Sequence, residues 1–197
     1  NCAMLSLKNI LATANLLPFQ KSKNMAATIE SLLKESKTLS PYLQQKEINK
    51  SIENTYRTYQ RYSSLFTHQI IHNNPSLTNF LVKNKTVYTL DLSHVKEDYA
   101  LNDLANLVVS CLFFNIPEKT IKMIINDYKR KHKLSSEYNT PIKALIQLKL
   151  LGEYLKNLRR EKGKYFSEYP EKMTRAYRSQ LLIRMKLSMA FLQPETL

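Results

Sequence analysis

Glycine is almost absent from this sequence of 197 residues, which contains only Gly152 and Gly163. A β-rich protein with many tight turns normally needs more glycine, because glycine adopts positive φ without steric cost. The scarcity therefore argues against a large β-sheet protein and favours a mainly helical chain.

Cysteine and long apolar runs are also scarce. Cys2 and Cys111 form no CxxC pair and no Cys/His cluster, which argues against a disulfide framework or a structural zinc site. Cys111 lies in an apolar run and is expected to be a buried thiol in an intracellular, reducing compartment. No apolar run approaches the ~20 residues needed to span a bilayer, and the first residues lack the pattern of a signal peptide.

Acidic residues are outnumbered, and the formal net charge is +14. Residues 1–118 contain 12 basic and 9 acidic residues, whereas residues 119–197 contain 18 and 7. Such a surface attracts nucleic acid, acidic proteins, phosphorylated ligands or anionic membranes, and charge alone does not choose among them.

Helical periodicity dominates what is present. We expect one domain over 1–197, with helices through 1–66, a loop and hairpin at 67–91, and helices again through 101–197. The individual helices are predicted at 4–16, 25–38, 41–66, 101–114, 117–132, 139–159 and 170–191. Within 67–79, the run Asn73-Asn74-Pro75 marks a loop. Two β-prone runs around Asn84-Lys85 then predict a single small β-hairpin over 80–90.

The loop and hairpin carry a recognisable constellation. Protein kinases use a catalytic loop of the form H-R-D-L-x-x-x-N, in which the Asp accepts the substrate's hydroxyl proton and the Asn binds metal; a later Asp completes the metal site. In this chain His72 matches the loop histidine, Asn79 matches the metal-binding asparagine, and Asp91 follows Asn79 by 12 residues, at the end of the hairpin. His72 would orient the loop; the alternative is an ordinary loop histidine.

The stretch from His72 to Ala105 resembles the aminoglycoside-phosphotransferase and choline-kinase-like superfamily, and most of all the CotS-type spore coat kinase-like proteins. In that branch the loop reads H-G-D-x-x-x-x-N and is followed by a hairpin, an Asp and a further Asp-Leu at the head of the next helix. Val87 to Asp91 and Asn102 to Ala105 fit that order. The resemblance implies the helical C-lobe of a two-lobed kinase fold, with Asp103 capping its helix and bonding the loop backbone.

Two departures from the family pattern affect the expected chemistry. Asn74 occupies the position of the catalytic Asp, and an amide cannot accept a proton as a carboxylate does. No glycine precedes Gly152, so no glycine-rich phosphate loop or N-lobe is recognisable. Asn79 and Asp91 are therefore interpreted as a vestigial metal site, with weak Mg²⁺ and ATP binding only if an N-lobe is present. The alternative is that they only brace the loop.

Two basic clusters are predicted to form a surface for a polyanion or an acidic partner, and they comprise Lys129, Arg130, Lys131, Lys133, Arg159, Arg160 and Lys162. The leading interpretation is a degenerate kinase-like protein that acts as a structural or assembly component, bacterial and associated with the spore coat if the resemblance holds. Its partners would be acidic proteins, including other coat proteins. The alternatives are a small-molecule phosphotransferase whose N-lobe lies outside this sequence, and a basic helical nucleic-acid-binding protein.

Overall fold

The computed structural model describes residues 20–21, 31, 34 and 45–162. The chain divides into two compact units, one built from residues 1–22 and 62–138 and the other from residues 23–61 and 139–197. The predicted helices at 4–16, 25–38 and 170–191 lie outside the described residues, apart from isolated positions. No helix in the described part of the chain is long and apolar enough to cross a membrane.

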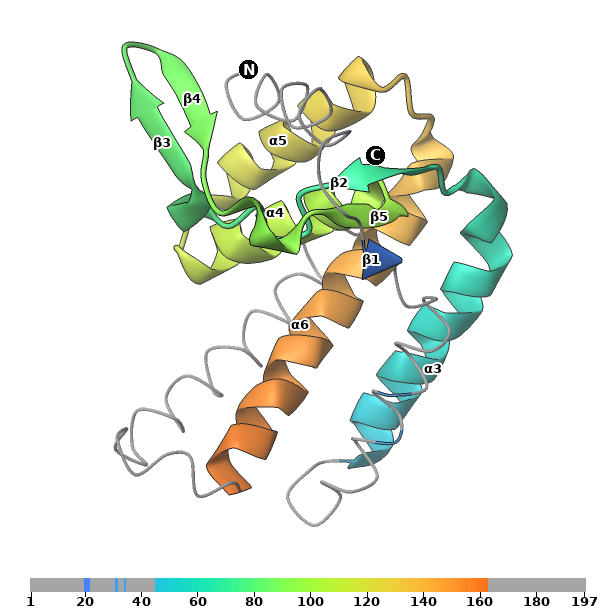
Figure 1. The fold of residues 1–197 in the computed structure, drawn as a ribbon. Helices are drawn as coiled ribbons and strands as arrows, with labels where there is room; N and C mark the ends of the chain where they lie inside the picture. The colour runs from blue at the N-terminus through green and yellow to red at the C-terminus, as the bar shows by residue number, and fades with distance from the viewer. Residues whose placement is uncertain (1–19, 22–30, 32–33, 35–44, 163–197) are drawn as a thin grey trace. The chain divides into compact units, whose positions relative to one another are not determined.

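The first unit contains a small mixed sheet (Figure 1). Strand β5 (Lys96–Tyr99) lies in the middle, pairing in parallel with β1 (Gln20–Lys21) and antiparallel with β2 (His68–Ile71). The register places His68 opposite Tyr99, and their rings contact edge to face with centroids 4.3 Å apart. Strand β2 ends at Ile71, so its pairing with β5 fixes the start of the loop that begins at His72.

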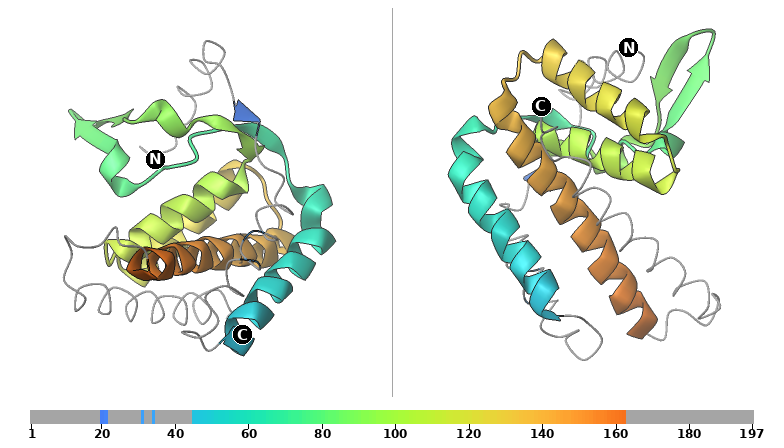
Figure 2. Two further views of the ribbon diagram at one scale, coloured as in Figure 1. Left: turned by 60° about the horizontal axis from the view of Figure 1, so that its bottom comes forward. Right: turned by 180° about the vertical axis from the view of Figure 1, so that it is seen from behind.

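The predicted hairpin is present, with β3 (Phe80–Lys83) antiparallel to β4 (Thr86–Thr89). Asn84 and Lys85 form its two-residue turn, with φ of 50° and 62°. Positive φ at both central residues is the requirement of a type I′ turn, which matches the twist of the flanking strands. The hairpin projects from the unit in two opposite views (Figures 1 and 2).

Two helices complete the first unit, α4 (Leu101–Phe113) and α5 (Glu118–Lys131). Between them, Asn115 takes a φ of 53°, a helix-ending conformation that asparagine tolerates, and Pro117 starts α5. The helices contact one another and bury a shared set of apolar side chains, including Leu104, Ala105, Val108, Ile121 and Ile125. Cys111 is buried, as expected, and burial raises its pKa to about 11.

The second unit contains α3 (Gln45–Tyr62) and the long helix α6 (Asn139–Lys162). Pro141 falls in the first turn of α6, where its missing amide hydrogen costs no intrahelical bond. The buried side chains of this unit include Ile52, Ile142, Ile146, Leu150 and Leu151. Short 3-10 turns occur at Ser63–Leu65, Leu77–Asn79, Leu92–His94 and Ser136–Tyr138.

The fold is mostly helical, but the expectation of a single hairpin as the only β structure was wrong. Strands β2 and β5 lie where the sequence predicts neither a helix nor a strand, and β1 lies within the 1–66 region, for which it predicts helices. The reason is visible in β5, whose residues Lys96-Glu97-Asp98-Tyr99 are mostly charged and lack the apolar alternation of a strand. Its extended conformation depends on pairing with β2, which sequence periodicity does not report.

Candidate functional site

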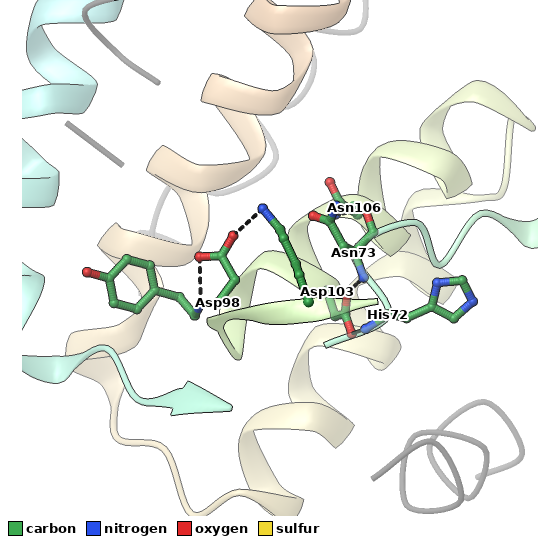
Figure 3. Close-up of polar contacts among 7 residues, drawn as sticks. His72, Asn73, Asp98, Asp103 and Asn106 are labelled. Carbon is green, nitrogen blue, oxygen red and sulfur yellow. Dashed lines mark hydrogen bonds and ion pairs between the residues drawn. The ribbon is translucent and has the colours of Figure 1, made fainter. Parts of the chain in front are cut away.

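The loop at 72–79 is anchored to helix α4 by Asp103. Its carboxylate accepts hydrogen bonds from the backbone amides of His72 (2.9 Å) and Asn73 (2.8 Å). Asp103 is only 3% exposed, so the charge is satisfied by backbone donors rather than by water. Helix α4 has Ala100 at its cap position, so the expected capping role of Asp103 was wrong. The other half of the expectation, that Asp103 bonds the loop backbone, is confirmed (Figure 3).

Two further side chains of α4 that were not predicted from the sequence hold the same loop. Asn106 donates from Nδ2 to the carbonyl of Asn73 at 2.9 Å. Ser110 Oγ accepts from the amide of Leu77 at 2.9 Å and lies 3.3 Å from Ser76 Oγ. Together with Asp103 these residues follow the i, i+3, i+7 spacing of one helix face. The available signal was a polar stripe in an otherwise apolar helix.

His72 links the loop to the end of the hairpin. The ring is fully buried, and its Nδ1 accepts from the backbone amide of Asn74 at 3.3 Å. Because a backbone N–H is only a donor, Nδ1 carries no proton, and Nε2 therefore carries one and donates to the carbonyl of Leu90 at 3.0 Å. The histidine thus fixes the residue immediately before Asp91.

Asn79 and Asp91 are brought to the same end of the hairpin. The amide of Leu90 donates to the carbonyl of Asn79 at 2.8 Å, so the chain reaches Asp91 one residue after contacting Asn79. Asn79 Nδ2 donates to the carbonyl of Asn74 at 2.9 Å, which leaves its side-chain oxygen as the atom suited to a cation.

The carboxylate of Asp91 is exposed, and Asp91 takes left-handed backbone angles. Its Oδ1 accepts from the hydroxyl of Ser93 at 2.5 Å and from the amide of Ser93 at 3.4 Å. The hydroxyl hydrogen bond is the main cause that lowers the pKa of Asp91, with a smaller contribution from the positive potential of His94. The carboxylate is therefore ionised at neutral pH, with one oxygen already engaged.

The residue at the base position, Asn74, is held on both sides by its backbone. Its amide donates to His72, and its carbonyl accepts from the side chain of Asn79 and from the amide of Ser76 at 2.8 Å. The loop geometry is thus completely built around a residue that has no carboxylate. Its side chain can donate or accept a hydrogen bond but cannot serve as a general base.

The fit to a divalent cation is partial. Among the described residues, no group of three or more His, Cys, Asp or Glu side chains is arranged to hold a metal. Asn79 and Asp91 supply two oxygen atoms, and Mg²⁺ commonly takes one or two protein ligands and completes its shell with water and substrate phosphates. These two residues would hold such an ion only together with a phosphorylated ligand.

A second buried carboxylate, Asp98 on β5, was not singled out from the sequence. It is 6% exposed, and its Oδ2 lies 2.6 Å from Lys96 Nζ while Oδ1 accepts from the amide of Tyr99 at 2.8 Å. Figure 3 shows this ion pair apart from the cluster formed by His72, Asn73, Asp103 and Asn106. Asp98 is satisfied within its own strand and belongs to the sheet.

The predicted basic surface falls into two places. Lys129, Arg130 and Lys131 form the last turn of α5, where positive charge complements the helix dipole, and Lys133 follows the helix. Arg130 pairs with Asp127 at 2.9 Å. Arg159, Arg160 and Lys162 belong to α6 in the other unit, and their side chains lie outside the described part.

His132 follows α5 and stacks on Tyr128, with ring centroids 4.3 Å apart. Burial, and to a lesser extent the charge of Lys131, lower the pKa of His132. This histidine therefore adds less positive charge to the basic run than an ordinary surface histidine would.

No protein-family model and no curated protein matches the chain. Solved structures do match. Choline kinase LicA from Streptococcus pneumoniae superposes with a TM-score of 0.57 at 15% identity, covering 93% of this chain and 60% of LicA. Amicoumacin kinase hAmiN, solved in complex with AMP-PNP, Ca²⁺ and Ami, superposes with a TM-score of 0.55 at 14% identity, covering 84% of this chain and 50% of hAmiN.

The chain therefore has a kinase-like fold, and its structural neighbours are members of the choline kinase and aminoglycoside phosphotransferase-like superfamily. It spans about half to three fifths of the length of these two neighbours. At this level of identity the likeness establishes the fold.

Proposed function

We propose that the chain is a degenerate kinase-like protein that acts as a structural or assembly component, similar in this respect to CotS-type spore coat proteins. One observation carries the proposal: the loop is fully anchored by Asp103 and His72, yet the residue that it presents at the base position is Asn74. A protein that retains the loop's architecture without its base uses the fold for binding rather than for turnover.

The partner in this proposal is an acidic protein. The net charge of +14 favours such partners, and the end of α5 offers a cluster of exposed basic side chains. The same charge is compatible with phosphorylated ligands, so nucleotide binding is the property to test first.

The test is isothermal titration calorimetry of the chain with MgATP. We expect binding no stronger than about millimolar, which corresponds to about −4 kcal/mol, because no glycine-rich segment precedes the loop to cradle phosphates. An Asp91→Asn variant serves as the control, since it removes the ionised carboxylate that would contact a metal ion next to the loop. Micromolar affinity that the variant abolishes would contradict the proposal and place a nucleotide at this site.

A second candidate function is a small-molecule phosphotransferase completed by a lobe outside this sequence. The observation that favours it is the retention of Asn79 and Asp91 at one end of the hairpin, on a fold whose solved neighbours include two kinases. Expression of the complete open reading frame, followed by the same titration, separates the two functions.

A further inference from the structure

One face of the β3–β4 hairpin exposes three large apolar side chains. In the hairpin register Leu81 lies opposite Tyr88, and Leu90 follows Tyr88 by two residues, which places all three on one face. Their exposed fractions are 51%, 49% and 44%. A solvent-facing strand surface normally carries polar residues at such positions, so we define these three residues as the hairpin patch.

The base of the opposite face already has a partner within the first unit, whereas Val82, nearer the tip of that face, is 66% exposed. The ring of Phe80 approaches that of His72, with centroids 6.4 Å apart, and Thr89 on the same face is half-buried. The base of the hairpin is fixed by hydrogen bonds from the amide of Leu90 to the carbonyl of Asn79 and from the ring of His72 to the carbonyl of Leu90. The patch is therefore presented on an anchored element, and its exposure does not arise from a misplaced register.

The charges around the patch select its occupant. Between Phe80 and Leu90 the hairpin carries two lysines, Lys83 and Lys85, and no acidic residue. A second copy of this chain would bring the same lysines and a net charge of +14, so self-association is opposed. A polyanion without apolar groups would leave the patch exposed to water.

We infer that the hairpin patch binds a protein segment that presents apolar side chains flanked by carboxylates. The apolar side chains cover Leu81, Tyr88 and Leu90, and the carboxylates meet Lys83, which is exposed on the same strand face as Leu81. This inference rests on the proposed assembly function and deepens it by naming a surface and a class of partner. It adds an apolar contact on the hairpin to the charge attraction that the proposed function assigns to the basic end of α5.

The test uses fluorescently labelled synthetic peptides and the whole chain. The probe is a short peptide of alternating leucine and glutamate, compared with peptides in which serine replaces leucine or lysine replaces glutamate. We expect the leucine–glutamate peptide to bind and the other two to bind at least about tenfold more weakly. Equal binding of the serine–glutamate peptide would overturn the inference, because it would show attraction by charge alone.

The variants separate the two faces of the same hairpin. Leu81→Thr with Tyr88→Thr removes the patch while keeping residues that favour strands. Val82→Thr is the matched control, because Val82 is 66% exposed but lies on the other face. We expect at least about a tenfold loss of affinity in the double variant and less than about a twofold change in the control. Equal losses, or no loss in the double variant, would overturn the inference.

A measurement on the unaltered chain keeps the inference testable if the double variant fails to fold. Backbone amide spectra should shift at residues 81, 88 and 90 on addition of the leucine–glutamate peptide. Shifts confined to α5, or hairpin shifts with MgATP but not with the peptide, would refute it. So would self-association of the chain that the double variant abolishes. Kinase turnover by the chain would contradict the assembly function but would not change the peptide-binding results at the hairpin patch.

Discussion

Asp103 shows how much of the site depends on a single carboxylate. It is buried and satisfies two backbone amides of the loop, at His72 and Asn73. Donors left without an acceptor on burial are costly. The residue therefore links the stability of the fold to the geometry of the loop.

Replacing Asp103 with alanine is expected to lower the free energy of unfolding by about 3 kcal/mol, because the buried amide of His72 and the partly buried amide of Asn73 lose their acceptor. Asp103→Asn should cost less, since its amide oxygen can still accept. Urea denaturation measures both. Asp127→Ala is the control: Asp127 makes an exposed pair with Arg130, and such pairs contribute ~0–1 kcal/mol. Similar losses in Asp103→Ala and Asp127→Ala would contradict the anchoring role.

Ser93 controls the ionisation of Asp91. Its hydroxyl is the main cause of the lowered pKa of that carboxyl. Ser93→Ala removes this donor, so the pKa of Asp91 should rise toward the ordinary value of an aspartate. The pKa of Asp91 is lower in the folded chain than in the unfolded chain. Its ionised carboxylate therefore contributes to the free energy of unfolding above the unfolded-state pKa, and this contribution is lost as the pH falls through the folded-state pKa. A carboxyl-carbon NMR titration of both chains measures the change, and an unshifted or lower pKa in the variant would contradict it.

At the scale of elements, α4 serves both as a core helix and as the support of the loop. Its apolar face buries Leu104 and Val108, while Asp103, Asn106 and Ser110 contact the loop along a second stripe. A polar stripe on a buried helix is tolerated because each group has a partner. The loop is thus positioned by a regular element, which holds it more precisely than other loops would.

Ser110→Ala tests this support locally. The substitution removes the acceptor for the amide of Leu77, so exchange of that amide with solvent should become faster while exchange in the α4 core changes little. The expected loss of stability is about 1–2 kcal/mol. Ser93→Ala is the matched control, since the hydroxyl of Ser93 bonds Asp91, whereas the amide of Leu77 bonds Ser110. Unchanged protection of Leu77 in Ser110→Ala would show that the loop is held by other contacts.

How much the sequence predicts differs between elements. Helices α4, α5 and α6 and the hairpin were predicted near their observed bounds, because each has its own period or turn chemistry. Strands β2 and β5 were not predicted. The β5 segment consists mostly of charged residues, and the two segments form strands by pairing with one another. His72 and Asp103 were found through motif spacing. Asn106 and Ser110 were missed because their partners lie 33 residues away in the chain.

At the scale of the whole molecule, the site is a well-built loop on a chain that spans only part of its structural neighbours. In phosphoryl transfer most of the acceleration comes from positioning and from stabilising charge on the phosphates. The residues that would do this in a kinase are not recognisable here, since no glycine occurs before Gly152. Restoring a carboxylate at residue 74 would therefore supply only the smaller contribution to the rate, that of the general base.

We therefore expect that Asn74→Asp will not create kinase activity in the 197-residue chain. The substitution returns a carboxylate to the base position, where both backbone groups are already fixed and Asn79 and Asp91 lie nearby. General-base assistance is typically worth ~10²–10⁴ in rate, which is too little without the stabilisation of phosphate charge. The measurement is ATP turnover by both chains, with and without small-molecule hydroxyl and amine acceptors.

The control for that experiment is the double variant Asn74→Asp with Asp91→Asn. Turnover that appears in Asn74→Asp and disappears in the double variant would refute the assembly function, because it would show that the site binds metal and nucleotide and lacks only its base. Turnover that persists in the double variant would instead identify a contaminating enzyme. No turnover in any chain is the expected result. A carboxylate at residue 74 could take a proton from a substrate's hydroxyl or amine usefully only if that group already faced a bound phosphate.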